Sequence, residues 1–439
     1  MQYAARLKSL IFVFGVLVAS GIAVSLDGVS TAFARSVGPI PYDTQMFDAA
    51  PKQALEYADY RAARIAWDFM VNNTVPETGW VNSVDGFESS TLWDQGSYVF
   101  ALVSALRLGL IDRVEFDERF ALFVGSLRKI ELIDATLPNK VYNTRSLLMT
   151  DYADGLRPDG IGWSALDIAR LLLALRTVER FAPQFGPDIR AVLARWNFAA
   201  MTKNGQMFGT TREDGKLLVL QEGRIGYEQY GARAAGLWGL DVNRAMSAIP
   251  IVNWRTIAGV EVPVDARTSA RFGTVTPVLS EPYILMGLEM GFDAESRVMA
   301  DRVFAAQHAR FTQDGIMTFV SEDHVDEFPH FVYSSVFSNG GNWAVVDSDG
   351  RRFDDLRTQW AKATYGWDAL FDTDYTNAGL ARIQHLARDG RGWMAGVYEN
   401  TGAWNASLSL NTNAIILEAL HFKKFGPLWN VAKAVDAED

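Results

Sequence analysis

The sequence predicts an all-α fold, an (α/α)6 toroid in which a double ring of helices carries short β-strand insertions. Three observations lead to this prediction. Apolar residues recur at helical spacing along most of the chain, low-charge helices rich in Ala, Gly, Ser and Leu alternate with more charged ones, and the low-charge helices follow glycine- and aromatic-rich loops. Because helices buried on most sides are apolar and small while outer ones keep a polar face, the alternation indicates an inner ring inside an outer one.

The helical spacing is illustrated by Leu166, Ala169 and Leu173, which share one face. We predict helices near 52–73, 94–109, 115–130, 164–182, 186–198, 227–239, 241–248, 280–290, 294–311, 353–371, 374–388 and 407–425. The inner set contains TLWDQGSYVFALVSAL, GIGWSALDIARLLLAL, RIGYEQYGARAAGLWGL, SEPYILMGLEMG and ASLSLNTNAIILEAL, with a sixth member in 353–371. Periodicity does not count the members of a closed ring, so a helical fold of another topology is the alternative.

Two segments have the pattern of strands. Residues 254–279 and 315–347 alternate and carry β-branched residues, and the second contains a Gly340-Gly341 turn signal. They are predicted to be insertions on the helical body.

The N-terminus has the pattern of a signal peptide over residues 1–34. Arg6 and Lys8 precede an apolar run at 10–24, and Ala32-Phe33-Ala34 is a cleavage signal. The run is shorter than the roughly 20 residues that span a membrane. We therefore expect an extension at 35–54, one domain at 55–428 and a tail at 429–439. The mature protein is expected to be periplasmic or secreted without stable membrane insertion, or anchored if the signal stays uncleaved.

Composition excludes several classes of function. The 439 residues carry a net charge of −11 and no cysteine, which argues against binding nucleic acid and excludes thiolate chemistry. No phosphate-binding loop, G-x-S-x-G elbow or H-E-x-x-H pair occurs. We predict no cofactor and no metal, and interpret EDHVDEFPH at 322–330 as a solvated loop.

Loops that enter the inner helices of a toroid converge at one end of the ring, here called the mouth. Aromatic residues stand beside carboxylates at these entries: Trp93 beside Asp94, Trp163 near Asp167, Tyr227 beside Glu228, Tyr283 near Glu281, and Trp404 near Glu399. Aromatic faces stack on sugar rings while polar groups bind hydroxyls, so the pattern favours a carbohydrate site.

Structural interpretations stand beside these functional ones. Asp94 has the position of a first-turn anion or helix cap. Asp167 lies three residues after Ser164, which is capping-box spacing, and we interpret it as structural. Glu281 precedes Pro282, the pattern of a proline in a first turn. Trp163 has an equal claim to be a core residue.

The stretch QEGRIGYEQY at 221–230 holds the strongest catalytic candidates. Glu222 lies in a loop, and Glu228 falls in the first turn of the next helix. Arg224 between them can keep one carboxylate ionised while the other, more buried, stays protonated. Glycoside cleavage needs such a pair, one group to protonate the leaving oxygen and the other to activate water or attack the anomeric carbon.

Five blocks carry a resemblance to a known family: TLWDQGSYVFALVSALRLGLI, YNT at 142–144, GIGWSALDIARLLLAL, QEGRIGYEQYGARAAGLWGLD and YENTGAWNASLSLNTNAIILEAL. The chain resembles, over residues 55–428, the bacterial domain of unknown function numbered 3131, whose members are typically exported or membrane-associated. That family is similar in plan to toroid glycosidases of the endo-β-1,2-glucanase group, whose acid is a glutamate in the middle third of the chain. The resemblance implies Glu222 or Glu228 as the acid, and leaves Asp94 and Glu399 as candidates for the base.

These observations together predict an exported glycoside hydrolase that acts on a glucan or related exopolysaccharide, with inversion expected by analogy. The predicted substrate-binding residues are Trp93, Trp163, Tyr227, Trp343 and Trp404 for stacking, with Arg224, Asn143, Glu281 and Asn413 for polar contacts. The alternative is a non-catalytic glycan-binding or polysaccharide-assembly factor on the same fold, and a structural envelope protein is a third class. Linkage, endo or exo action and oligomeric state stay open.

Overall fold

Hydroxyl side chains begin three of the helices that meet at the mouth. Thr91, Ser164 and Ser409 each accept a hydrogen bond from the backbone N–H three residues later, which satisfies an otherwise unpaired donor at the helix start. The computed structural model describes residues 46–268 and 272–430. Its helices are α2 (Tyr57–Asn73), α3 (Leu92–Arg107), α4 (Arg113–Leu127), α5 (Ala165–Phe181), α6 (Gly186–Leu193), α7 (Tyr227–Gly236), α9 (Glu281–Leu285), α10 (Ala294–Asp314), α11 (Ala361–Phe371), α12 (Asp374–Ile383) and α13 (Leu410–Phe425).

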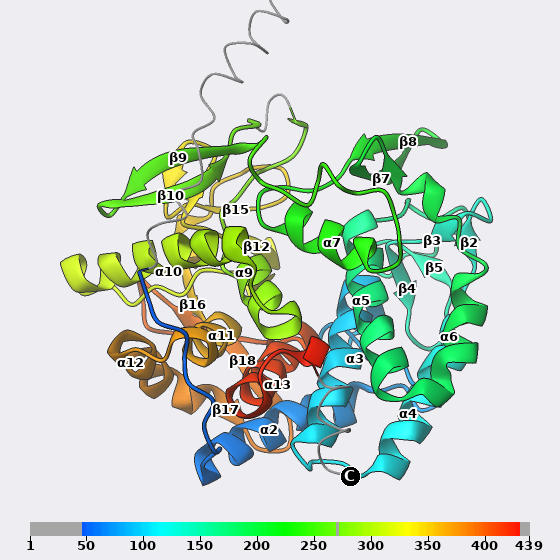
Figure 1. Ribbon diagram of the computed structural model, residues 1–439, viewed down its shortest axis with the longest axis horizontal. Coiled ribbons are helices and arrows are strands. Elements are labelled where there is room, and N and C mark those ends of the chain that lie inside the picture. The colour runs from blue at the N-terminus through cyan, green and yellow to red at the C-terminus, as the bar shows by residue number, and fades with distance from the viewer. Residues whose placement is uncertain (1–45, 269–271, 431–439) are drawn as a thin grey trace, which may run out of the picture.

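Helices α3, α5, α7, α9, α11 and α13 form a closed ring, in which each packs on the next and α13 packs back on α3 (Figure 1). Helices α2, α4, α6, α10 and α12 lie outside this ring. Close approach within the ring needs small residues. A Cβ atom on Gly366 would lie 2.4 Å from the Ile284 side chain, and one on Gly96 would lie 3.2 Å from Arg170. The double ring of helices agrees with the predicted arrangement.

Three predicted helices differ in the structure. Residues 241–248 form turns, because a segment this short does not offset the cost of helix nucleation. The helix predicted at 280–290 is short, since α9 continues as a π-helical turn, Met286–Met290. Residues 353–360 are not helical throughout; they contain the 3-10 turn Asp354–Leu356 and a strand before α11 begins.

Strands are more numerous than the two predicted insertions. They are β1 (Ser89–Thr91), β2 (Leu132–Ile133), β3 (Leu137–Pro138), β4 (Val141–Asn143), β5 (Met149–Thr150), β6 (Thr202–Lys203), β7 (Gln206–Glu213), β8 (Lys216–Gln221), β9 (Val252–Ile257), β10 (Val260–Asp265), β11 (Glu322–His324), β12 (Phe331–Ser334), β13 (Phe337–Ser338), β14 (Gly341–Asn342), β15 (Val345–Val346), β16 (Thr358–Trp360), β17 (Ala387–Arg388), β18 (Gly392–Tyr398) and β19 (Trp404–Leu408).

The pairing of these strands is antiparallel, in small sheets such as β6-β7-β8 and β11-β12-β15. The two predicted insertions contain β9–β10 and β11–β15. The β7–β8 hairpin and the β16-β18-β19 pairing were not predicted. Strands β1, β16 and β19 each lead directly into an inner helix, α3, α11 and α13. The sheets therefore lie where the inner helices begin, and they fix the residues of the mouth.

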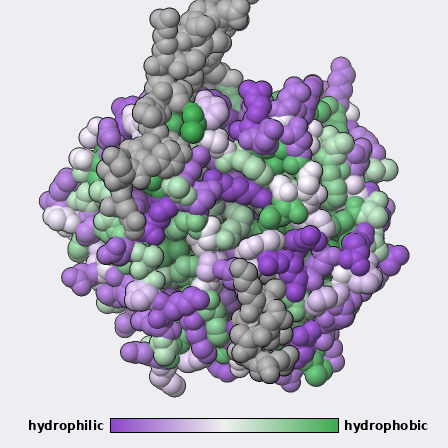
Figure 2. Space-filling model, viewed as in Figure 1, coloured by the Kyte–Doolittle hydropathy of each residue, from purple (hydrophilic) through white to green (hydrophobic). Residues whose placement is uncertain are grey.

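An irregular segment crosses the end of the ring that lies opposite the mouth. The chain from residue 46 to α2 runs across α11 and α12 (Figure 1) and donates backbone hydrogen bonds from Ala50 to Leu370 and from Gln53 to Lys423. Hydrophilic and hydrophobic residues intermingle on this face (Figure 2). None of the helices in residues 46–268 and 272–430 is long and apolar enough to cross a membrane. The predicted signal peptide lies outside the described residues.

A charged cluster occupies the axis of the ring. The Arg170 guanidinium lies 3.0 Å from Glu289 and 3.4 Å from Glu418, and all three side chains are fully buried. Tyr230 donates a hydrogen bond of 2.5 Å to Glu289. Burial, then the Glu289 carboxylate, raises the pKa of Glu418 well above its usual value, so Glu418 keeps its proton and hydrogen-bonds to Glu289. One cation then faces one carboxylate in the interior.

Candidate active site

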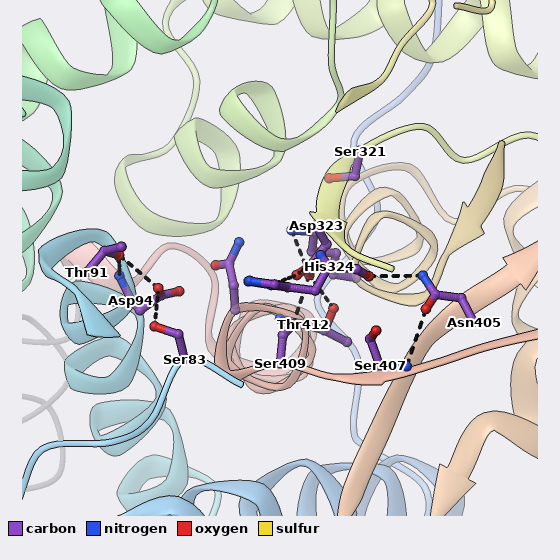
Figure 3. Close-up of polar contacts among 12 residues, drawn as sticks. Ser83, Thr91, Asp94, Ser321, Asp323, His324, Asn405, Ser407, Ser409 and Thr412 are labelled. Carbon is purple, nitrogen blue, oxygen red and sulfur yellow. Dashed lines mark hydrogen bonds and ion pairs between the residues drawn. The ribbon is translucent and has the colours of Figure 1, made fainter. Parts of the chain in front are cut away.

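Asp94 projects from the first turn of α3 into the mouth. Its Oδ2 atom accepts hydrogen bonds from Ser83 (2.5 Å) and Thr91 (2.8 Å), as Figure 3 shows. Burial raises the pKa of Asp94, which is 8% exposed, and the two hydroxyl donors act against this effect. Both donors bind one oxygen, so Oδ1 has no hydrogen bond among the described residues. The capping role and a chemical role therefore coexist at this residue.

Asp167 and Glu222 lie on either side of one hydroxyl group. Ser164 Oγ is 2.9 Å from Asp167 Oδ1 and 2.7 Å from Glu222 Oε1. A hydroxyl has one proton to donate, so both contacts are hydrogen bonds only if one carboxyl group is protonated. Glu222 also accepts the Ala165 N–H at 2.5 Å, at the start of α5. Burial, then the Glu222 charge, raises the pKa of Asp167 to about 7, and burial raises the pKa of Glu222.

Asp94 and this pair belong to one electrostatic group. The Asp94 charge contributes to the raised pKa of Asp167. Burial raises the pKa of the Tyr152 hydroxyl, followed by the charges of Asp167, Tyr333, Glu222 and Asp94. The Tyr152 residue is 65% exposed to solvent. Its ring lies at the surface, and its hydroxyl is within electrostatic reach of the three carboxyl groups.

A further carboxyl group with a raised pKa, Glu322 of β11, contacts the first residue of α7. Tyr227 donates a 2.6 Å hydrogen bond to Glu322 Oε1. Burial raises the pKa of Glu322 to about 7, against the effect of Arg224. The Arg224 guanidinium lies 4.7 Å from the centre of the Tyr333 ring and 5.7 Å from that of Tyr227. Arg224 thus lies among aromatic rings and beside Glu322, and its charge opposes the rise in the pKa of Glu222 that burial causes.

Lys362 joins Glu281 to Asp323 at the centre of the mouth. Its Nζ atom lies 2.6 Å from Glu281 and 3.1 Å from Asp323, and the three side chains are almost wholly buried. Asn411 donates to Glu281 at 2.8 Å. Ser409 and Thr412 on α13 donate to Asp323 at 2.9 and 2.8 Å. The N-terminal ends of α9, α11 and α13 are connected through these contacts.

His324 follows Asp323 on β11, and Figure 3 shows both across from Asp94, over the start of α13. Its ring Nδ1 lies 3.1 Å from Asp323 Oδ1. Burial works to raise the pKa of Asp323, but Lys362 and then His324 hold it well below the usual range. The first part of segment 322–330 is therefore not a solvated loop, because Asp323 is 2% exposed and Glu322 and Asp323 are built into the mouth. Residues 326–328 are exposed, as predicted.

Trp93 packs beneath these groups. Its ring lies 5.4 Å from Tyr227 and 5.7 Å from Tyr230, measured between ring centres. The Arg170 guanidinium of the axial cluster lies 4.7 Å from the Trp93 ring centre, within the range of a cation–π contact. Trp93 and Tyr227 are thus brought together, as the sequence suggested.

Two predicted carboxylates have other partners. Glu228 is buried beside Arg267, 2.7 Å away, with Gln221 at 3.3 Å. Glu399 accepts two hydrogen bonds from Arg310, at 2.7 and 2.8 Å. A side chain with both carboxylate oxygens held by one guanidinium is positioned for structure. Within the described residues, neither Glu228 nor Glu399 forms a side-chain hydrogen bond or ion pair with Asp94, Asp167 or Glu222.

Five predicted binding residues make structural contacts. Asn143 bonds to Asp154, and Trp163 donates to the Phe208 carbonyl. Asn413 accepts the Trp393 N–H at 2.7 Å and so joins β18 to α13. The ring of Trp343 lies under Arg310. Trp404 is 48% exposed and packs on His385 and Arg388.

Several mouth residues escaped the sequence-based prediction. Ser164 caps α5 by accepting the Asp167 N–H, and the same hydroxyl lies between the carboxyl groups of Asp167 and Glu222. Glu322, Asp323 and Lys362 come from β11 and α11, and no local pattern connects them. The signal that could have found them was the unusual density of carboxylates in EDHVDEFPH together with a lysine at the start of a low-charge helix.

Solved structures share this fold. An endo-β-1,2-glucanase from Chitinophaga pinensis, in a sophorotriose and glucose complex, is 11% identical with a TM-score of 0.61, over 86% of this chain and 95% of that one. One from Talaromyces funiculosus, with sophorose, is 11% identical with a TM-score of 0.56, over 87% and 86%. A candidate glucoamylase from Bacteroides uniformis is 12% identical with a TM-score of 0.61, over 87% and 95%.

These glycosidases are of the (α/α)6-toroid type. At such low identity the likeness concerns the fold alone. A search of curated protein sequences gives no match to the chain. The sequence signature of one family matches residues 61–426, which is most of the chain and includes every mouth residue described above. The chain therefore belongs to the family of proteins of unknown function designated DUF3131.

Proposed function

We propose that the protein is an exported glycoside hydrolase that acts on a glucan, with β-1,2-linked glucans the first substrates to test. The observation that carries the proposal is the pair Asp167 and Glu222, which share one hydroxyl group near Asp94 at the mouth of a glycosidase-like toroid. The fold supports the reaction class, because solved structures of the same fold include endo-β-1,2-glucanases. Fold alone does not establish activity, so the argument rests on the carboxyl groups.

The Asp167–Glu222 pair supplies the acid. A carboxyl group with a pKa of about 7 is protonated in a large fraction of molecules at neutral pH, and the ideal acid has a pKa near the working pH. Glu222 accepts bonds from Ser164 and Ala165, which favour its ionised form. Asp167 therefore carries the proton and donates it to the glycosidic oxygen. The ionised Glu222 carboxylate keeps the proton on Asp167 until that transfer.

Asp94 activates the water. Two hydroxyl groups bind its Oδ2 atom and fix the carboxylate, which leaves Oδ1 to accept a hydrogen bond from the attacking water. Trp93 and Tyr227 form the aromatic base of the site, and Tyr152 and Tyr333 contact sugar from above. Inversion is the proposed outcome, and it requires the two carboxyl groups to stand roughly 6.5–9.5 Å apart.

Turnover assays on linear and cyclic β-1,2-glucans, with other β-glucans in parallel, test the proposal. We expect wild type to release oligosaccharides and D167N, E222Q and D94N each to lose at least about a hundredfold in kcat, the usual contribution of a general acid or base. E213Q, an exposed carboxylate on the β7 hairpin, is the matched control and should keep wild-type rates. Product stereochemistry, followed by NMR, tests inversion.

Two results would change the assignment. Loss of turnover in E228Q, with D167N and E222Q active, moves the acid to Glu228. Glycan binding without turnover by wild type would favour the non-catalytic glycan-binding or assembly factor. Export is tested separately: the mass of the mature protein should correspond to a chain that begins after Ala34, recovered from the periplasm or medium.

A further inference from the structure

We propose that His324, oriented by Asp323, is a second proton acceptor of the site, which acts with Asp94 on the attacking water. The inference rests on the proposed function, because it assigns a role within the same reaction. Neither residue was singled out by the sequence, and His324 comes from a different part of the chain than Asp94.

The Asp323 carboxylate fixes the imidazole. Its Oδ1 atom accepts the His324 backbone N–H at 2.7 Å and lies 3.1 Å from the His324 Nδ1 atom. A carboxylate only accepts hydrogen bonds, so this contact places the proton on Nδ1. The Nε2 atom then carries the lone pair and is the basic nitrogen.

Asp323 is itself held rigidly and stays ionised. Its Oδ2 atom receives hydrogen bonds from Ser409 and Thr412 and an ion pair from Lys362 at 3.1 Å. These three groups belong to α13 and α11, so the carboxylate joins three elements of the mouth. A buried carboxylate with so many donors has little freedom to turn away from His324.

The imidazole is partly open to the mouth, across from Asp94 (Figure 3). The His324 side chain is 32% exposed, whereas Asp323 beneath it is 2% exposed. Its Nε2 atom has no hydrogen bond among the described residues. Charged groups lie near the ring: Asp94 from α3, Asp323 from β11 and, on the far side of Asp323, Lys362 from α11. The charge of His324 acts against the burial that raises the pKa of Asp94. Phe331 packs its ring against the imidazole, 5.3 Å between centres.

The proton balance of the step is complete. The water oxygen forms a bond to the anomeric carbon as the glycosidic bond breaks. The leaving oxygen takes the proton of Asp167, and the proton from water goes to the Nε2 atom of His324 with Asp94 hydrogen-bonded to the same water. The resulting imidazolium lies between two carboxylates, Asp94 and Asp323, which stabilise its charge. Release of that proton, and return of one to the Asp167–Glu222 pair, restores the site.

The test compares H324Q and D323N with wild type over pH 4–9. H324Q should lower kcat by about 10²–10⁴-fold, the range for loss of a positioned proton acceptor, with KM changed less than threefold. The D323N variant keeps the imidazole but no longer fixes which ring nitrogen carries the proton. It should therefore lower kcat at unchanged KM. Wild type should lose kcat/KM at low pH, where a proton on the Nε2 atom blocks its role as acceptor, and H324Q should lack that loss. H330N, an exposed histidine on the same hairpin, is the control.

A second measurement needs no activity. In protein labelled with 15N-histidine, the His324 signals, assigned by their absence in H324Q, should show an unprotonated Nε2 in wild type and a mixture of tautomers in D323N. A protonated Nε2 in wild type overturns the orientation. Wild-type kcat in H324Q overturns the role of His324 while the proposed function stands. No turnover by wild type on any glucan overturns both.

Discussion

Burial decides what each carboxyl group of the mouth does. Asp167, Glu322 and Asp94 have raised pKa values because burial penalises their charged forms. Asp323 is as deeply buried, yet Lys362 and His324 keep its pKa low. The difference is the number and charge of donors within reach, since cations and hydrogen bonds to the ionised form offset desolvation. The proposed acid Asp167 and the ionised Asp323 are the same residue type, so the groups around each one determine its protonation.

A first prediction concerns the pH dependence of stability at Asp167. Its folded pKa of about 7 lies above the usual value for an aspartate of 3.8, so the unfolded state ionises first as pH rises. Wild type therefore loses stability between about pH 4 and pH 7. D167N has no such ionisation. We expect the Tm of D167N minus that of wild type to increase from pH 4 to pH 7 and to level off above. Calorimetry across that range checks it, and a constant difference contradicts it.

A second prediction separates the two carboxyl groups of the axial cluster. Glu418 carries a proton, so E418Q replaces one neutral group with another and should leave the free energy of unfolding at pH 7 equal to or above that of wild type. Glu289 compensates Arg170. E289Q should therefore cost about 3–5 kcal/mol, the range for breaking a buried pair.

Urea denaturation at pH 7 measures both variants. Equal destabilisation in E418Q and E289Q would show that the proton does not reside on Glu418. Because Arg170 lies under Trp93, E289Q should also change the fluorescence of the folded protein, an effect not expected for E418Q.

At the level of elements, the loops that enter the inner helices carry the site. Trp163 accepts the Thr210 backbone N–H and donates its own N–H to the Thr210 hydroxyl on β7, and this pairing delivers Ser164, Asp167 and the start of α5. A Cβ atom on Gly162 would lie 2.3 Å from the Thr210 carbonyl oxygen, at a φ of +118°. The close approach of two backbones therefore positions the acid pair.

A third prediction follows for G162A, with G109A as its matched control. Gly109 also has a positive φ, +73°, but a Cβ atom there meets nothing within 4 Å. G109A should cost about 1–2 kcal/mol, the backbone term alone. G162A should cost more, because the β7 backbone must move, and it should lower kcat. Equal losses of stability in the two variants, measured by urea unfolding, would contradict the steric argument.

The whole molecule is closed, and closure links its halves. Helix α13 packs on both α3 and α11, so the last inner helix completes the ring with the first. In an open array of repeats each unit contacts only its neighbours and parts can unfold separately. In a closed ring the loss of any inner helix exposes the faces of two others.

A fourth prediction is a single cooperative transition. Tryptophan fluorescence and far-UV circular dichroism should give coincident urea unfolding curves, the signature of two-state behaviour. Removal of residues 410–439 should prevent formation of a cooperatively folded protein. Two separated transitions in the full chain would show that the ring is not the unit of stability.

The sequence alone determined the helices, their inner and outer order and several of the mouth residues. Helix periodicity is local, so the helices predicted near 94–109, 164–182 and 407–425 correspond to α3, α5 and α13, and Ser164 marked the start of α5. Thr91 and Ser409, which cap the other two, were not recognised as caps. The β7–β8 hairpin and β16-β18-β19 were missed, because their pairing depends on contacts between strands rather than on local alternation. Residues 241–248 were predicted to be helical from their apolar spacing, but the segment is too short to offset the cost of helix nucleation and forms turns.

Only the tertiary structure decided which charged groups meet. Glu222 reaches Ser164 across 58 residues, Asp323 reaches Thr412 across 89, and Asn411 reaches Glu281 across 130. Residue type and helix position marked Glu228 and Glu399 as strongly as Glu222, but Arg267 and Arg310 hold the first two. Electrostatic roles depend on distances between elements, and a sequence pattern reports neighbours along the chain alone. Which residues serve as the proposed acid and base therefore depends on how the closed ring brings the elements together.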